Sequence, residues 1–275
     1  MKPRNLESNQ PSLEEAAEVR MRMLTLLHKS QASHIGTCLS VIEILLAVYK
    51  NVDIEKIRDR TDDRDRVVVS KGHSAAALYT VLNHFGLLRD GELETYHQNN
   101  SLLGGHVTTT VSGVEHSTGA LGHGLSVAVG IGIGLRNKKT SSRVYVIVGD
   151  GELHEGSNWE AIHSAAHLKL GNLCLLVDYN KLSGIGKTND CCNLEPLKSK
   201  LESFGFETFE VNGHHQDEIY TTIQKTRDFE RPVAIICHTI KGKGVSFMEN
   251  NNVWHSRPLN KEDYEKAMLE IRDEK

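Results

Sequence analysis

Apolar residues along the chain fall into two repeating patterns. A spacing of three and four positions predicts amphipathic helices, and short apolar or β-branched runs predict strands. The helices are expected at 13–29, 39–49, 75–85, 124–136, 154–170 and 216–227. The strands are expected at 67–70, 143–148, 173–177, 207–211 and 233–239. Ser12 and Glu15 have the spacing of a capping box at the first helix.

The order of these segments predicts the fold class. Strands that alternate with helices indicate a doubly wound α/β fold, with a mostly parallel sheet and helices on both faces. Because no repeat or linker interrupts 13–238, we expect a single domain over residues 1–275, with an N-terminal helix and a C-terminal loop and helix. Mixed charges at 53–66 indicate a solvated face. The Gly-, Ser-, Thr- and His-rich stretch 101–124 predicts a long functional loop.

Composition narrows the class of protein. The 275 residues include 32 Lys and Arg against 36 Asp and Glu, so no basic field is available to hold nucleic acid. Five cysteines, without a Cys-x-x-Cys, form neither a disulfide framework nor a zinc knuckle. No apolar run reaches the ~18 residues of a membrane span, and the polar N-terminus does not match a signal peptide. We expect a soluble cytoplasmic protein with no membrane partner.

Two polar sequences follow consecutive predicted strands. Gly149-Asp150-Gly151 comes directly after the strand at 143–148, and Asn180 follows the strand at 173–177. Since the carboxyl ends of neighbouring parallel strands meet at one edge, Asp150 and Asn180 are expected to face the same place. Their oxygens suit Mg²⁺ or Ca²⁺, completed by a backbone carbonyl, water and phosphate. Either sequence alone also fits a simple turn or helix cap.

The strand-helix-strand unit from Gly149 to Asn180 resembles the thiamine diphosphate motif, in the form found in transketolases. Further segments resemble that family in the same order along the chain. These segments are 32–36, 70–73, 105–106, 113–122, 152–156, 241–244 and 254–255. Two residues depart from the family pattern: Ile35 stands where the family often has Pro, and His123 stands where it often has Gln.

The resemblance implies a set of site residues. The metal would be held by Asp150, Asn180 and the backbone carbonyl of Leu182. Thiamine diphosphate would be bound by His73, Gly119, Leu121, Gly149, Gly151, Asn180 and His255. The catalytic residues would be His34, His73, His106 and His255, imidazoles able to donate hydrogen bonds or move protons near neutral pH.

The resemblance also implies a partner. It covers only the diphosphate-binding half of a transketolase, so we expect a C-terminal subunit to supply the pyrimidine-binding domain and its Glu, with two of each chain. Glu155 and Glu160 match family glutamates that cluster across a subunit interface. The expected reaction moves a two-carbon ketol unit from a ketose to an aldose, and the sequence identifies neither sugar. Alternatives are a 2-oxo-acid or deoxyxylulose-phosphate synthase type of thiamine enzyme, or a silent scaffold subunit.

Overall fold

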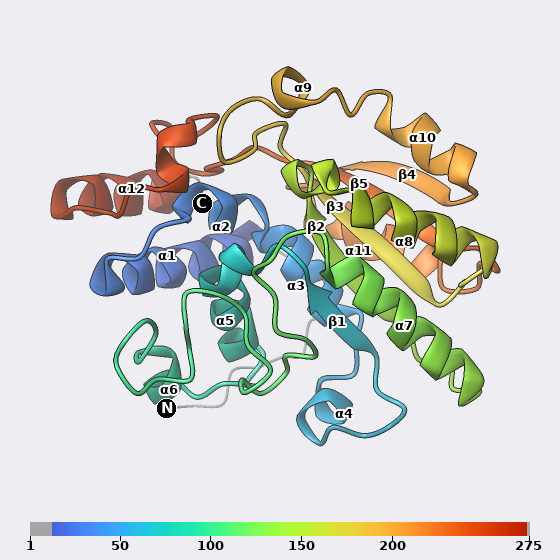
Figure 1. The fold of residues 1–275 in the computed structure, drawn as a ribbon. Helices are drawn as coiled ribbons and strands as arrows, with labels where there is room; N and C mark the ends of the chain where they lie inside the picture. The colour runs from blue at the N-terminus through green and yellow to red at the C-terminus, as the bar shows by residue number, and fades with distance from the viewer. Residues whose placement is uncertain (1–12, 274–275) are drawn as a thin grey trace.

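Five strands form a parallel sheet at the centre of the structure. The computed structural model describes residues 13–273 (Figure 1). Within them the strand order is β1-β2-β3-β5-β4, and every neighbouring pair is parallel. The strands are β1 (Arg66–Val69), β2 (Val144–Gly149), β3 (Leu173–Tyr179), β4 (Glu207–Asn212) and β5 (Val233–His238). This confirms the predicted fold class and each of the five strand positions.

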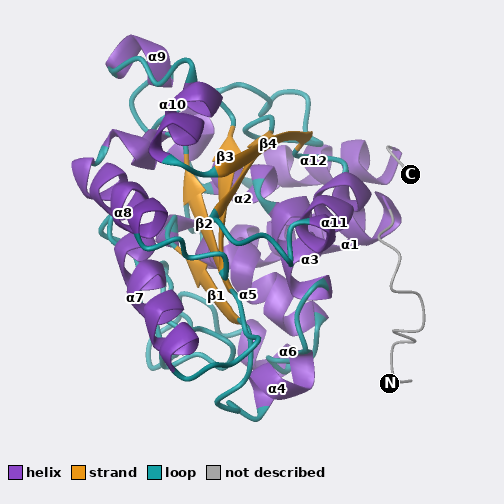
Figure 2. Cartoon of the chain, turned by 90° about the vertical axis from the view of Figure 1, so that its right-hand side faces the viewer, coloured by secondary structure: helices purple, strands orange, loops and turns teal. Residues whose placement is uncertain are grey.

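Helices cover both faces of the sheet (Figures 1 and 2). Alternate strand residues enter two cores, as a period of two requires: Tyr145 and Ile147 lie in one, Val146 and Val148 in the other. The first core includes α1 (Leu13–Ser30), α3 (Ile42–Lys50), α5 (Ala75–His84), α11 (Gln216–Lys225) and α12 (Lys261–Asp273). The second includes α7 (Gly124–Asn137), α8 (Gly156–His167) and α10 (Leu197–Phe204).

The handedness of the connections explains which helices share a face. From β1 to β4 the chain advances across the sheet in one direction, and the helices that directly precede β2, β3 and β4 all lie on one side. It then turns back from β4 to β5, so α11 packs on the opposite side. Right-handed crossovers require this change of face when the direction reverses.

Several local predictions were incomplete. The helix expected at 39–49 is divided at Val41 into α2 (Ile35–Ser40) and α3, and the charged stretch 53–66 contains α4 (Ile54–Arg58). The helix expected from residue 154 begins at Gly156, after a 3₁₀ turn, η2 (Gly151–His154). Sequence reasoning missed α6 (Asp90–Leu93), α9 (Thr188–Cys191) and α10, because such short helices repeat an apolar pattern once at most.

Two expectations remain predictions. Ser12 of the proposed capping box lies outside the described residues, and the single-domain organisation stays a prediction.

Among residues 13–273, no helix is both long and apolar enough to cross a bilayer.

The long segment 101–123 packs against the carboxyl end of β1. Thr118 Oγ1 donates to the Val69 carbonyl at 2.7 Å. A Cβ at Gly72 would come within 2.6 Å of the Thr118 carbonyl carbon and 2.7 Å of the Gly119 nitrogen. The absence of a side chain at Gly72 therefore lets this segment approach the edge of the sheet where β1, β2 and β3 end.

Candidate active site

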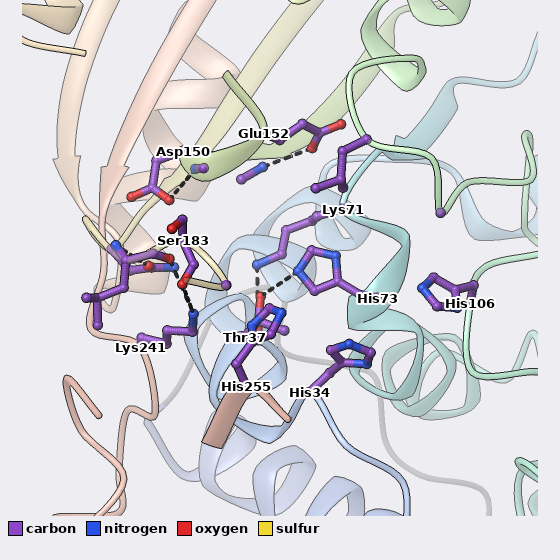
Figure 3. A pocket seen from close by; sticks show the side chains of 17 residues that line it. His34, Thr37, Lys71, His73, His106, Asp150, Glu152, Ser183, Lys241 and His255 are labelled. Carbon is purple, nitrogen blue, oxygen red and sulfur yellow. Dashed lines mark hydrogen bonds between the residues drawn. The ribbon is translucent and has the colours of Figure 1, made fainter. Parts of the chain in front are cut away.

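A cavity of about 280 Å³, here called the central pocket, opens at the carboxyl ends of β1, β2 and β3 (Figure 3). Its walls contain every predicted site residue. These are His34, His73, His106, Gly119, Leu121, Gly149, Asp150, Gly151, Asn180, Leu182 and His255. The structure thus brings together residues spread over more than 200 positions, while their individual roles remain predictions.

Asp150 and Asn180 follow adjacent strands, as expected. The ends of β2 and β3 are in register at Gly149 and Asp178, and the Asp150 amide donates to the Asp178 carbonyl at 3.2 Å. The Asp150 carboxylate accepts hydrogen bonds from the amides of Gly151, at 2.7 Å, and Lys181. Burial, then the Asp178 carboxylate, raise the pKa of Asp150 to about 7. This buried carboxyl group therefore fits a site that a cation would complete.

Asn180 and Leu182 supply the other oxygens predicted to bind metal. Asn180 Oδ1 accepts from the Leu182 amide at 3.1 Å, which orients the side-chain oxygen. In residues 13–273 no group of three or more His, Cys, Asp and Glu side chains is arranged for a metal ion. One carboxylate, one amide and one carbonyl suit a hard cation whose remaining ligands are phosphate and water.

Two buried lysines give the pocket positive charge. Lys71 and Lys241 are each 1% exposed. Lys71 forms an ion pair with the buried Asp178. Within residues 13–273 the Lys241 ammonium donates only to neutral oxygens: the carbonyls of Leu182 (3.3 Å) and Ser183 (3.0 Å) and Asn252 Oδ1 (3.0 Å). Burial, then Lys71, lower the pKa of Lys241 to about 8. A buried ammonium with neutral partners fits an anion such as a diphosphate.

Glycines bring two loops close to this charge. A Cβ at Gly151 would lie 3.0 Å from Ser183 Cβ, so the turn after β2 approaches the loop after β3 closely. Gly119 has φ of 154° and faces the His106 ring, which a Cβ would approach within 3.2 Å. At both positions the missing side chain lets the backbone of one loop approach its neighbour more closely than another residue would allow.

The four predicted histidines form one cluster around His34. Its ring centroid lies 5.4 Å from that of His73, 5.9 Å from His106 and 5.2 Å from His255. His34 has φ of 69° at the start of α2, and its amide donates to the His255 carbonyl at 2.9 Å. These contacts hold the histidine segments together, and the four rings lie near one another in the wall of the pocket (Figure 3).

The environment favours neutral imidazoles. Burial lowers the pKa of His34, aided by His106, and lowers the pKa of His73 well below its usual value, aided by Lys71. Burial, then Lys241, lower the pKa of His255 to about 4. These three rings are therefore uncharged at neutral pH, and each can both donate and accept a hydrogen bond.

Sequence reasoning missed several residues of the pocket. Lys71, Lys241, Thr37, Glu152, Ser183 and Gly184 also line it. The two lysines stand inside segments that carry the family resemblance, next to or near the assigned histidines, so the signal was present. By contrast, His123, Glu155 and Glu160 are exposed and lie outside the central pocket.

The family model described as transketolase, thiamine diphosphate binding domain, matches residues 13–271. The chain belongs to the transketolase family. This confirms the resemblance identified from the sequence.

Similar proteins include several that are named as subunits of transketolases. The chain is 38% identical over 257 residues to one of the subunits of the apulose-4-phosphate transketolase of Phocaeicola vulgatus, covering 92% of this chain and 90% of the relative. It is 35% identical to the 6-deoxy-6-sulfo-D-fructose transketolase subunit SqwG of a Clostridium species, and the match covers 98% of this chain and 99% of the relative.

Solved transketolases share the fold. The crystal structure of transketolase from Campylobacter jejuni aligns with a TM-score of 0.85 at 28% identity, covering 94% of this chain and 42% of that one. This transketolase-family chain therefore spans about two fifths of the length of that solved enzyme.

Proposed function

We propose that the chain is the N-terminal subunit of a thiamine diphosphate- and Mg²⁺-dependent transketolase that transfers a two-carbon ketol unit from a ketose to an aldose. Ca²⁺ is the alternative ion. The observation that carries this proposal is the convergence of the predicted metal ligands, the four histidines and two buried lysines on one pocket. We further propose a single domain over residues 1–275 and a cytoplasmic location.

The residues nearest β2 and β3 would hold the cofactor. Asp150, Asn180 and the Leu182 carbonyl would bind the cation, and the Lys241 ammonium would offset the charge of the diphosphate. The backbones of Gly119, Gly149 and Gly151 would approach the cofactor closely, and Leu121 would contact its aminopyrimidine region. When bound, thiamine diphosphate supplies the nucleophilic carbon that such carbon–carbon bond chemistry needs.

The histidines would act on the substrate side. Neutral imidazoles can hold a proton at one ring nitrogen and accept one at the other. His255 Nδ1 is buried without a hydrogen-bond partner among the described residues, so it is free to bond a ligand. His73 Nε2 lies 3.4 Å from Thr37 Oγ1, which orients that ring, while His34 and His106 would line the channel beside them.

A separate C-terminal subunit would complete the site. Support comes from relatives whose names describe each of them as one subunit of a transketolase, matched over 90% and 100% of their lengths. The partner would contribute the pyrimidine-binding domain and its Glu, in an assembly of two of each chain. The exposed Glu155, which directly precedes α8, and the exposed Glu160 within that helix would lie at the contact between subunits.

Reconstitution with the partner tests this proposal. The chain and a C-terminal subunit that carries the pyrimidine-domain Glu are mixed with thiamine diphosphate and Mg²⁺, and cofactor binding is followed by calorimetry. We expect binding and ketol transfer from ketose donors, with sugar phosphates and sulfo sugars both in the panel. Turnover of 2-oxo acids but not ketoses would favour the other thiamine enzymes. Undetectable cofactor binding in the mixture would favour a scaffold subunit.

A further inference from the structure

A second cavity lies beside the central pocket, over the carboxyl ends of β3 and β5. Tyr179 and His238, which pair at the ends of these strands, line it, and its volume is about 580 Å³. That volume is within the range of small-molecule sites. We call it the β3–β5 pocket.

The topology of the sheet accounts for a crevice at this place. The connection that leaves β3 leads to α10 on one face, whereas the connection that leaves β5 leads to α12 on the other. Loops that diverge from adjacent parallel strands leave a ligand-binding crevice between them. The central pocket occupies the corresponding position between β1 and β2, whose connections also diverge, to α5 and α8.

The lining of the β3–β5 pocket favours an anion. Lys181 and Lys187 line it, and no carboxylate side chain does. The Lys181 ammonium lies 5.4 Å from the Tyr179 ring centroid. The nearby carboxylates are already engaged: Glu195 accepts from the Tyr179 hydroxyl, and Glu210 is 3.0 Å from His238 Nε2. Glu195 also attracts the Lys181 ammonium and offsets part of its charge, but no carboxylate lies in the wall of the cavity itself.

Neutral donors complete this arrangement. Asn189 and Asn250, whose side chains carry amide donors, line the pocket. Thr188 also lines it, is fully buried, and its hydroxyl oxygen has no hydrogen-bond partner within residues 13–273. A buried hydroxyl without a partner is costly unless a ligand or water supplies one.

We propose that the β3–β5 pocket binds a phosphate group, either inorganic phosphate or the phosphate of a small metabolite. Two ammonium groups and several neutral donors are the chemistry that recognises this dianion. The site is separate from the central pocket, although the residues Asn180 and Leu182 line both.

The wall between the two pockets is a small hairpin. Leu182 and Lys187 form an isolated antiparallel bridge, and the Thr188 amide donates to the Lys181 carbonyl at 3.0 Å. Ser183 and Gly184 of this hairpin line the central pocket, while Lys187 lines the other side. This hairpin therefore separates the two pockets.

An NMR titration tests phosphate binding independently of any activity. The full chain, labelled with ¹⁵N, is titrated with inorganic phosphate, with ribose 5-phosphate and with ribose. We expect saturable shifts of the Lys187 and Asn189 amide signals with both phosphates and none with ribose. Tighter binding of ribose 5-phosphate identifies a phosphorylated metabolite as the ligand, and equal binding identifies free phosphate. Shifts confined to Gly119 and Gly151, or equal shifts with ribose, overturn the proposal.

Variants separate the two pockets. The double variant Lys181→Asn/Lys187→Ala is expected to weaken phosphate binding, followed at the 187–189 amide signals, at least tenfold. Shifts of signals from the central pocket should remain. Asn is chosen at position 181 because it tolerates the positive φ there. Lys225→Ala removes an exposed lysine of α11 and serves as the matched control. Unchanged affinity in the double variant, or an equal loss in the control, contradicts the assignment. If the parent chain binds phosphate but does not bind thiamine diphosphate when mixed with its C-terminal subunit, the proposed function alone is contradicted.

Discussion

At the scale of single residues, burial decides the charge of the side chains in the central pocket. His73 and His255 lie where the neutral ring is favoured, whereas Lys241 keeps an ammonium among neutral oxygens. The residue types were visible in the sequence, but their protonation follows from neighbours that are distant along the chain.

Asp150→Ala removes the only carboxylate of the proposed metal site. We expect the assembled complex to lose Mg²⁺-dependent affinity for thiamine diphosphate by at least about 100-fold, since loss of even an outer-shell partner costs 10- to 100-fold. Calorimetric titration measures the affinity, and circular dichroism checks the fold. The exposed Asp228→Ala is the control. Wild-type affinity in Asp150→Ala would refute the assigned ligand.

His255 predicts a pH dependence of stability. Its pKa falls from about 6.5 in the unfolded chain to about 4 in the folded one, so the unfolded state binds the proton more tightly. The free energy of unfolding should therefore fall as the pH drops from about 6.5 to 4. His255→Asn should reduce this fall by about 1 kcal/mol, a value discounted for the ring's partial exposure. Urea unfolding at several pH values measures it.

The exposed His163→Asn is the matched control for this slope. If His255→Asn and His163→Asn follow the same pH profile as the parent chain, the buried, neutral state of His255 is wrong.

At the scale of elements, loops at one edge of the sheet are joined through Glu152. Its Oε1 accepts from the Ser70 hydroxyl and from the Gly122 amide at 2.9 Å, and Oε2 accepts from the Gly149 amide at 3.2 Å. One carboxylate thus connects the ends of β1 and β2 with the segment 101–123. Burial raises its pKa, so the ionised form depends on these donors.

Glu152→Gln tests this connection. The substitution keeps the shape but places an NH₂ group against a donor, leaving buried groups unsatisfied. We expect a loss of about 1–3 kcal/mol in the free energy of unfolding, with earlier proteolysis within 101–123. Denaturant unfolding and mass spectrometry of the fragments provide the measurements. Glu202→Gln, on the exposed side of α10, should change neither, and equal stability of the two variants would contradict this role.

At the scale of the whole molecule, distant segments meet at Asp178. Its buried carboxylate pairs with Lys71 and accepts hydrogen bonds from Ser40 Oγ at 2.6 Å and from Thr239 Oγ1. Burial would raise the pKa of Asp178, but Lys71 and these hydroxyls hold it below its usual value. The ends of β1, β3 and β5 and the helix α2 are thereby fixed together beneath the central pocket.

Lys71→Met should leave this carboxylate unpaired. We expect a cost of about 3–5 kcal/mol in the free energy of unfolding, because a buried charge loses its partner. The double variant Lys71→Met/Asp178→Asn should recover most of it. The exposed Lys56–Asp63 pair provides the control, since solvent screens it and Lys56→Met should leave the free energy of unfolding nearly unchanged. A double variant no more stable than Lys71→Met would contradict an electrostatic origin.

The sequence by itself determined the alternation of strands and helices, the family and many of the residues that line the candidate site, because these depend on local periodicity and on motifs within short segments. It did not indicate α10, whose few turns carry little periodic signal, nor the roles of Lys71 and Lys241. Only the tertiary structure decided those, together with the neutral histidines, the Glu152 and Asp178 networks and the β3–β5 pocket. Burial and charge pairing arise from segments far apart in the chain, and these meet only when the sheet has formed.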